Sequence, residues 1–268
     1  MTDSIFNQLR ALIDTGAPVG LATVIDGPAT GAKLMAPLDG DPVGSLGDVS
    51  LNRVVTRDML GELVAGRSGV RHYGEHGEAR EDTVSVFIEA FAPPPRMIIF
   101  GAVDFTAALV RVAKVLGYRI TVCDARPVFA TTQRFPQADE VEVCWPNDLL
   151  DEIGSHLGPR DAVCVLTHDN KFDVPAITGV LQTDVGYIGV MGSRSTHENR
   201  SVRLREAGVT DTELDRLMSP IGLDIGARTP EETAVSICSE IIALRTGRAA
   251  PSLRHGEGPI HAPQRQSS

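Results

Sequence analysis

The segment LTHDNKFD, residues 166–173, places a histidine between a hydroxyl and a carboxylate side chain, directly after an apolar run. His168 could exchange a proton near neutral pH, and a carboxylate such as Asp169 could orient its ring. Thr167 lies beside them in the same loop. A single His–Asp neighbour pair is a nonspecific pattern, and Asp173 could simply cap a helix. Thr167, His168 and Asp169 are therefore candidate ligand contacts, and His168 and Asp169 are also the candidates for proton exchange.

A second segment, YIGVMGSRSTHENR, residues 187–200, has the residue types of an anion-binding loop. Gly192 and Ser193 end an apolar run and lead into a predicted helix that carries Arg194 and Arg200. Small residues with free backbone amides at a helix start, next to guanidinium groups, can bind a phosphate. The same residues are also compatible with an ordinary turn. We take Gly192, Ser193 and Arg194 as candidate ligand contacts.

The segment CDARPVFA, residues 123–130, follows a strand-like run and contains an acid and a base two residues apart. Asp124 lies about where the acidic residue of a dinucleotide-binding fold contacts a ribose hydroxyl. Arg126 could meet a phosphate. The alternative is an Asp–Arg pair that braces a turn before Pro127, and the sequence favours neither interpretation.

The segment RMIIFGAVDFTAALV, residues 96–110, is predicted to form a strand, a tight turn at Gly101 and a helix. This is the setting of the G-x-G-x-x-G fingerprint, but Val103 and Thr106 replace its second and third glycines. The β-branched Val103 would fill the space of a pyrophosphate, and the carboxylate of Asp104 would repel it. As a dinucleotide signal the segment is weak, and a purely structural turn explains it equally well.

Other features narrow the function classes. The sequence contains no Walker lysine pattern, no H-E-x-x-H, no G-x-S-x-G and no C-x-x-C pair, which removes several enzyme classes. No metal-ligating residues are predicted. A formal charge of −10 over 268 residues argues against a nucleic-acid or acidic-membrane surface. The apolar runs are too short to span a membrane, and the N-terminus lacks the pattern of a signal peptide. Cys123 and Cys164 lie in apolar runs, where reduced, buried thiols and a cytoplasmic location are expected.

Strand-like and helix-like segments alternate regularly after residue 96, which predicts an α/β domain with a parallel, doubly wound, Rossmann-like sheet. In such sheets ligands bind at the carboxyl ends of the strands, where all four segments would lie. The final helix is predicted to begin with Thr229 as N-cap, Pro230 in the first helical position and Glu232 completing a capping box.

The first third of the chain has a different pattern. Strand-like runs and one helical run between residues 50 and 66 predict a smaller α+β domain over residues 1–92. The proline-rich stretch at residues 92–96 marks the boundary. We therefore expect a Rossmann-like domain at 93–248 and a disordered tail at 249–268, where Pro, Gly, Ser, His and Gln are frequent.

Several long segments together resemble one family. IFGAVDFTAALVRVAKVLGYRITVCDARPVFA, RFPQAD, VLTHDNKFD, YIGVMGSR and SPIGLDIGARTPEETAVSICSEI look like the xanthine dehydrogenase accessory (XdhC/CoxI) family. They cover most of residues 96–248 in order. The N-terminal third resembles the smaller domain of this family more loosely, through GLATVID and GDPVGSLGDVSLN.

The resemblance implies an accessory factor, rather than an enzyme, that binds the molybdenum cofactor during maturation of a molybdenum hydroxylase. It implies molybdopterin as the ligand, with or without an attached nucleotide. The expected partners are an apo molybdenum hydroxylase, a cysteine desulfurase and a second copy of the chain, with no nucleic acid and no membrane. The residues expected to contact the cofactor are Gly101, Asp124, Arg126, Thr167, His168, Asp169, Gly192, Ser193 and Arg194.

The resemblance also assigns roles to these residues. Gly192, Ser193 and Arg194 would bind the phosphate, and Asp124 and Arg126 a ribose or pterin edge. His168 and Asp169 would contact polar atoms near the metal end.

Two motifs depart from the family pattern. The family has G-A-G-H at the first turn, where this chain has Val103 and Asp104 in the last two positions. The family has G-G-G-C-x-E near the N-terminus, where this chain has Ser50 in place of the cysteine. Two alternatives therefore stay open: an NAD(P)-dependent oxidoreductase, and a degenerate member that acts as a protein-interaction scaffold.

Overall fold

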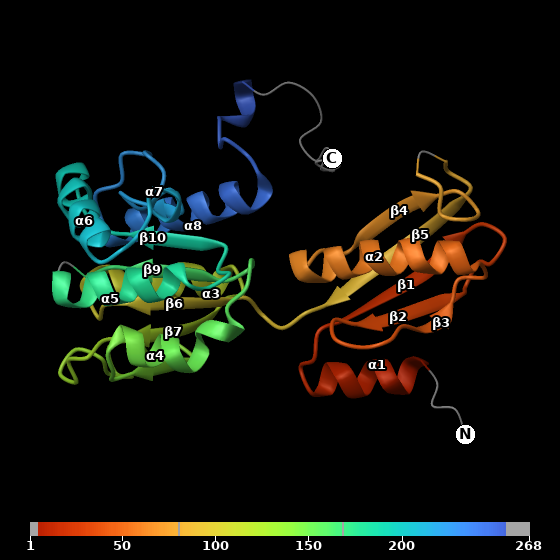
Figure 1. The fold of residues 1–268 in the computed structure, drawn as a ribbon, viewed down its shortest axis with the longest axis horizontal. Helices are drawn as coiled ribbons and strands as arrows, with labels where there is room; N and C mark the ends of the chain where they lie inside the picture. The colour runs from red at the N-terminus through yellow and green to blue at the C-terminus, as the bar shows by residue number, and fades with distance from the viewer. Residues whose placement is uncertain (1–4, 80, 168, 256–268) are drawn as a thin grey trace. The chain divides into compact units, whose positions relative to one another are not determined.

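The computed structural model describes residues 5–79, 81–167 and 169–255, and the chain divides between Pro95 and Arg96 into two compact units. The first unit is built on a five-stranded antiparallel sheet with the order β3-β2-β1-β5-β4 (Figure 1). Its strands are β1 Val19–Asp26, β2 Lys33–Pro37, β3 Val43–Ser45, β4 Gly69–Tyr73 and β5 Val84–Phe91. The sequence did not predict β4.

One helix covers each face of this sheet. Helix α2, Val49–Ala65, buries an apolar stripe against the face that includes Ala22 and Val24. The stripe repeats every four residues: Leu51, Val55, Met59 and Leu63. Helix α1, Ile5–Asp14, packs on the opposite face, which carries Val19 and Leu21, because successive residues of a strand point to opposite sides.

The second unit contains a six-stranded parallel sheet with the order β11-β10-β9-β6-β7-β8. Its strands are β6 Arg96–Phe100, β7 Arg119–Cys123, β8 Glu140–Glu142, β9 Ala162–Val165, β10 Tyr187–Val190 and β11 Leu217–Met218. Counted within this unit the order is 3-2-1-4-5-6, with the direction of winding reversing between β6 and β9. The predicted doubly wound Rossmann-like sheet is confirmed.

Helices cover both faces of the parallel sheet (Figure 1). Helices α3, Asp104–Val115, and α8, Pro230–Thr246, pack on one face. Helices α4, Pro146–Ile153, α5, Asn170–Leu181, and α6, Arg194–Glu206, pack on the other. Helix α7, Asp211–Leu214, and two 3₁₀ turns, Gly154–His156 and Leu253–His255, complete the described chain. None of the helices in the described ranges is long and apolar enough to cross a membrane.

Two local predictions can be compared directly with the structure. The capping box of α8 is confirmed, because the amide of Glu232 donates to the Thr229 hydroxyl and the amide of Thr229 donates to the Glu232 carboxylate. A Val–Pro pair such as Val174–Pro175 resembles a helix start in the sequence, but α5 starts earlier. The helix begins at Asn170 and contains Pro175 in its interior. Asp173, which the sequence offered as an alternative cap, does not cap this helix: Asp169 is the N-cap and accepts a hydrogen bond from the amide of Lys171 at 3.0 Å.

The predicted burial of Cys123 and Cys164 is confirmed, and both thiols are free. Burial raises the pKa of each thiol, so both are protonated at neutral pH.

Gly101 is required where β6 approaches β9. Its φ of +113° lies in the region that disfavours other residues. A Cβ at this position would lie 2.7 Å from Thr167 Cγ2 and 3.0 Å from the Thr167 amide nitrogen. The glycine therefore permits the close contact between the two strand ends at the switch point.

We expect Gly101→Ala to lower the free energy of unfolding by about 3 kcal/mol, because it combines backbone strain with a clash against backbone atoms. Gly117→Ala is the matched control, since Gly117 has a φ of +81° but open space around its Cβ position. Its expected cost is about 1 kcal/mol, from backbone strain alone. Urea unfolding of both variants measures the difference, and equal costs would show that the close approach is not a constraint.

Candidate functional site

The candidate site lies at the carboxyl ends of the central parallel strands. The turn after β6, the loop after β7, the loop after β9 and the turn after β10 all emerge at this edge of the sheet. These are the four segments that the sequence singled out. We refer to this edge as the crevice.

The backbone amides of the turn after β6 donate hydrogen bonds to acceptors within the protein. The Gly101 amide donates to the Cys123 carbonyl at 2.9 Å, and the Ala102 amide donates to Asp124 Oδ2 at 2.8 Å. The Val103 amide donates to Thr106 Oγ1 at 3.4 Å, and the Thr106 hydroxyl donates in turn to the Gly101 carbonyl. In a dinucleotide-binding turn such amides are available to the pyrophosphate. Here three successive amides already have protein partners.

Asp124 is the acceptor at the centre of this arrangement. Its side chain is almost completely buried and accepts from the backbone amide of Arg126 at 3.0 Å, from Arg126 Nε at 2.8 Å and from Arg126 Nη2 at 2.7 Å, besides the Ala102 amide. Burial alone would raise the pKa of Asp124, but these hydrogen bonds outweigh it and hold the pKa below its ordinary value. The structure therefore contains the Asp–Arg pair that braces a turn, which was the second of the two interpretations left open by the sequence.

The Arg126 side chain is partly exposed, unlike that of Asp124, and lies among aromatic rings. Its guanidinium group is 4.6 Å from the centre of the Phe129 ring and 5.8 Å from that of Phe172. Phe172 stacks on Trp145, with ring centres 4.6 Å apart and planes 18° from parallel. Phe129 and Trp145 are each more than two-fifths exposed. We call Phe129, Phe172 and Trp145 the aromatic edge; it offers flat surfaces to a heterocycle.

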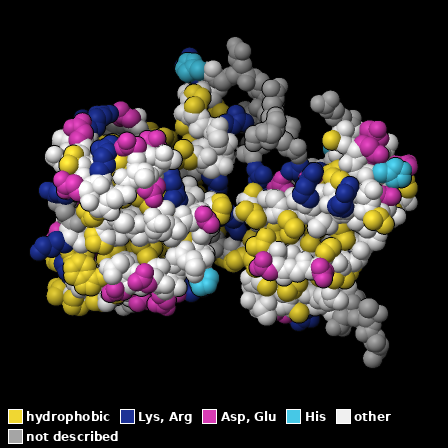
Figure 2. All heavy atoms as spheres, in the orientation of Figure 1, with side chains coloured by type: hydrophobic (Ala, Val, Ile, Leu, Met, Phe, Trp, Pro, Cys, Tyr) yellow, Lys and Arg dark blue, Asp and Glu magenta, His cyan; other side chains and the backbone are white. Residues whose placement is uncertain are grey.

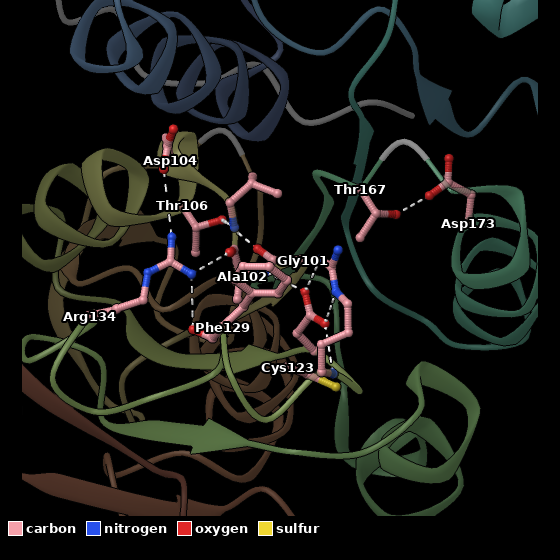
Figure 3. Close-up of polar contacts among 12 residues, drawn as sticks. Gly101, Ala102, Asp104, Thr106, Cys123, Phe129, Arg134, Thr167 and Asp173 are labelled. Atoms are coloured by element: carbon pink, nitrogen blue, oxygen red, sulfur yellow. Dashed lines mark hydrogen bonds and ion pairs between the residues drawn. The ribbon is translucent and has the colours of Figure 1, made fainter.

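Sequence reasoning missed the aromatic edge and also Arg134. Arg134 Nη1 donates to the carbonyls of Ala102, at 3.0 Å, and Phe129, at 3.2 Å, while its Nη2 lies 3.6 Å from the carboxylate of Asp104 (Figure 3). Arg134 therefore ties the first turn to the loop after β7 and offsets the negative charge of Asp104. The only sequence signal was its place in the RFPQAD segment.

The loop after β9 begins with a buried polar cluster. The Thr167 hydroxyl donates to Asp173 Oδ1, and Arg200 Nη2 donates to Asp173 Oδ2 at 2.8 Å (the Thr167 contact is drawn in Figure 3). All three residues are buried, and the cluster joins the end of β9 to α5 and α6. His168, the candidate for proton exchange, lies outside the described residues. Asp169 is exposed and caps α5.

The turn after β10 leads into α6 with hydroxyl groups at its start. Ser193 is the N-cap, and its Oγ accepts from the Thr196 amide at 3.1 Å. The same oxygen lies 2.9 Å from Ser195 Oγ and 2.8 Å from Thr196 Oγ1. Arg194 is exposed, and the preceding Gly192 has a φ of +148°. The crevice thus has a helix start with an accessible cation on this side.

The predicted contacts fall on two sides of the crevice. Gly101, Asp124 and Arg126 lie together on the β6–β7 side, where hydrogen bonds connect the first turn to the Asp–Arg pair. The turn of Gly192 and Ser193 lies on the β9–β10 side, together with Thr167 through its link to Asp173 and Arg200. Charged side chains of both signs are interspersed on the visible face of this unit (Figure 2).

Residues 97–241 match the XdhC Rossmann domain. The chain belongs to the XdhC family. This match covers more than half of the chain and confirms the resemblance found in the sequence.

Three curated relatives of this XdhC chain share part of their length with it. A Bacillus subtilis protein described as a probable xanthine dehydrogenase subunit is 36% identical over 62% of this chain and 47% of its own length. The uncharacterized protein YqeB of Escherichia coli is 26% identical over 90% of this chain and 46% of its own length. The molybdenum cofactor insertion chaperone PaoD of Escherichia coli is 24% identical over 59% of this chain and 43% of its own length. The XdhC chain therefore spans less than half the length of each of these relatives.

A solved structure covers both units of the XdhC chain. A Bacillus halodurans protein described as a xanthine dehydrogenase is 25% identical, with a TM-score of 0.55, and the alignment covers 92% of this chain and 97% of that protein. The likeness thus includes the smaller antiparallel unit, in which Ser50 lies exposed in the first turn of α2.

We expect Asp124→Asn to lower the free energy of unfolding by about 2 kcal/mol at neutral pH, because an amide nitrogen cannot accept the charge-assisted hydrogen bonds of the pair. The pKa of Asp124 is below its unfolded value of 3.8. Its stabilising effect is therefore complete above that pH and is lost as the pH falls through the folded pKa.

Urea unfolding at neutral and acidic pH measures this effect, and the difference between wild type and variant should shrink in acid. Asp148→Asn is the control, because Asp148 is exposed and bonds only to the neighbouring Asn147 among the described contacts. A deficit of the Asp124 variant that persists unchanged below the folded pKa would contradict the assigned role.

Proposed function

We propose that this XdhC chain is an accessory protein that holds the molybdenum cofactor during maturation of a molybdenum hydroxylase of the xanthine or CO dehydrogenase type. The observation that carries the proposal is the match of residues 97–241 to the XdhC Rossmann domain. One of its relatives is named as a molybdenum cofactor insertion chaperone, which agrees with this role.

The chemistry of the crevice supports such a ligand. Molybdopterin joins a flat heterocycle to a phosphate, so it needs a planar surface and a group of hydrogen-bond donors. The aromatic edge and Arg126 provide the planar surface. The start of α6 provides the hydrogen-bond donors, and Arg200 beside it has buried nitrogens without a hydrogen-bond partner among the described residues. The residues present therefore fit the cofactor.

These observations refine the roles expected from the sequence. Gly192, Ser193 and Arg194 hold the phosphate, and Arg126 contacts the pterin or ribose edge. Asp124 positions Arg126, since its carboxylate already accepts hydrogen bonds from the Ala102 amide and from Arg126. We keep His168 and Asp169 as contacts near the metal end. The bound cofactor supplies the molybdenum centre that the target enzyme uses.

The remaining parts of the proposal concern partners and location. We propose an apo molybdenum hydroxylase as the recipient, a cysteine desulfurase as the source of the terminal sulfur, and a homodimer as the assembly. The free cysteines in the described ranges support a cytoplasmic location. Whether the cofactor carries a nucleotide is an outcome of the co-purification experiment.

The test is to purify the full chain after co-expression with the enzymes of cofactor biosynthesis, and to measure molybdenum by mass spectrometry and oxidised pterin by fluorescence. We expect both to co-purify with the protein. Arg126→Gln should reduce pterin retention about tenfold, because it removes the charge held over the aromatic edge. Arg119→Gln is the matched control, since Arg119 is an exposed arginine at the opposite end of β7.

NADH titration under the same conditions separates this proposal from an oxidoreductase. Protein that contains no pterin but binds NADH at micromolar concentration would contradict the proposal. Nothing in the described crevice favours that outcome, because the first-turn amides that would hold a pyrophosphate have internal partners.

A further inference from the structure

We infer that the guanidinium group of Arg200 is the buried cation of a phosphate site at the start of α6. The ligand class is a tetrahedral oxyanion: free phosphate or the phosphate of a phosphomonoester. The site follows from the geometry of this chain alone. Its assignment to the phosphate of the pterin cofactor rests on the proposed function.

The first argument is the incomplete hydrogen bonding of Arg200. The side chain is 2% exposed, and Nη2 donates to Asp173 Oδ2 at 2.8 Å and to the Met191 carbonyl at 3.0 Å. Its Nε and Nη1 are buried and have no partner among the residues that the structure describes. An arginine offers five N–H donors and stays charged, so donors buried without acceptors are costly. An oxyanion would supply the acceptors.

The second argument is the direction in which the guanidinium group points. Side chains of a helix tilt toward its N-terminus, and Arg200 reaches back to the Met191 carbonyl, before α6 begins at Arg194. A Cβ at Gly192 would lie 3.2 Å from Thr196 Cβ and Cγ2 and 3.6 Å from Arg200 Nη1. Nη1 of the guanidinium group therefore lies next to the glycine of the turn, and a side chain at that position would lie against both Nη1 and Thr196.

The third argument is the convergence of other positive and hydrogen-bonding groups. Helix α6 has 13 residues, so its N-terminus carries the partial positive charge of a full helix. The hydroxyls of Ser193, Ser195 and Thr196 gather at this end, and Arg194 is exposed beside them. The charge of Arg200 is partly offset by Asp173, so the helix end and Arg194 are needed to bind an anion of more than one charge.

The experiment is calorimetric titration of the full chain with inorganic phosphate at constant ionic strength, because exposed charges are screened by salt. We expect Arg200→Lys and Gly192→Ala each to weaken phosphate binding about tenfold or more, the first by removing the fork of donors and the second by covering it. The controls are Arg203→Lys, an exposed arginine on the same helix, and Gly208→Ala, which has a φ of +93° and open space beyond the other end of α6. Both controls should bind phosphate as the wild type does.

A measurement on the wild-type protein covers the case in which a substitution prevents folding. Burial and the positive charge of Arg200 lower the pKa of His197, which lies one turn before Arg200 on α6. An anion bound to Arg200 offsets that charge, so phosphate should raise the pKa of His197 in an NMR titration. No calorimetric signal, or no shift of His197 at saturating phosphate, would overturn the site.

Two further ligands distinguish the sources of the phosphate. Oxidised pterin with its phosphate should bind about tenfold more tightly than the dephosphorylated pterin, and Arg200→Lys should remove the difference. If inorganic phosphate binds but neither pterin does, the anion site stands and the cofactor proposal fails. If both pterins bind equally and inorganic phosphate does not bind, the anion site fails while the cofactor proposal stands.

Discussion

The ion pair between Asp173 and Arg200 holds together the segments on one side of the crevice. Asp173 belongs to α5 and accepts a hydrogen bond from Thr167 after β9, while Arg200 belongs to α6 and donates to the Met191 carbonyl directly after β10. Both partners are buried, so loss of either would leave an unpaired charge in the interior at a cost of roughly 3–5 kcal/mol. The pair therefore fixes two neighbouring strand ends relative to each other before any ligand binds.

The two sides of the crevice differ in the hydrogen-bond donors that they leave available to a ligand. On the β6–β7 side, Asp124 satisfies the Ala102 amide and orients Arg126, so the turn is self-contained and presents a guanidinium group framed by aromatic rings. On the β9–β10 side, Arg200 retains donors that the described residues do not satisfy. A ligand with a flat part and an anionic part matches this division. The turn after β6 is held by internal hydrogen bonds, so the chain keeps the strand order of a dinucleotide-binding fold without the usual glycine pattern.

The fold could be predicted from the sequence because strand-like and helix-like periods alternate clearly after residue 96. The errors have local physical causes. Pro175 suggested a helix start, although the Asp169 cap lies earlier in the chain. In the smaller unit β4 was missed, because Gly69–Tyr73 is short and mostly exposed and so lacks an apolar pattern. The positions of the crevice loops followed from the topology. The sequence left the role of Asp124 open between two interpretations and did not indicate that of Thr167, since sequence does not reveal which acceptor a buried donor will find.

The self-contained turn after β6 has a consequence for how nucleotide affinity could arise in this fold. The Ala102 amide donates to Asp124 and the Val103 amide to Thr106. The oxygens of a pyrophosphate bound there would have to displace these two acceptors, so existing hydrogen bonds would be replaced and none would be added. Restoring a glycine at Val103 would remove the steric obstacle and leave this exchange unchanged. Nucleotide affinity at this turn would therefore depend on which backbone donors already have protein acceptors, and not on the glycine pattern alone.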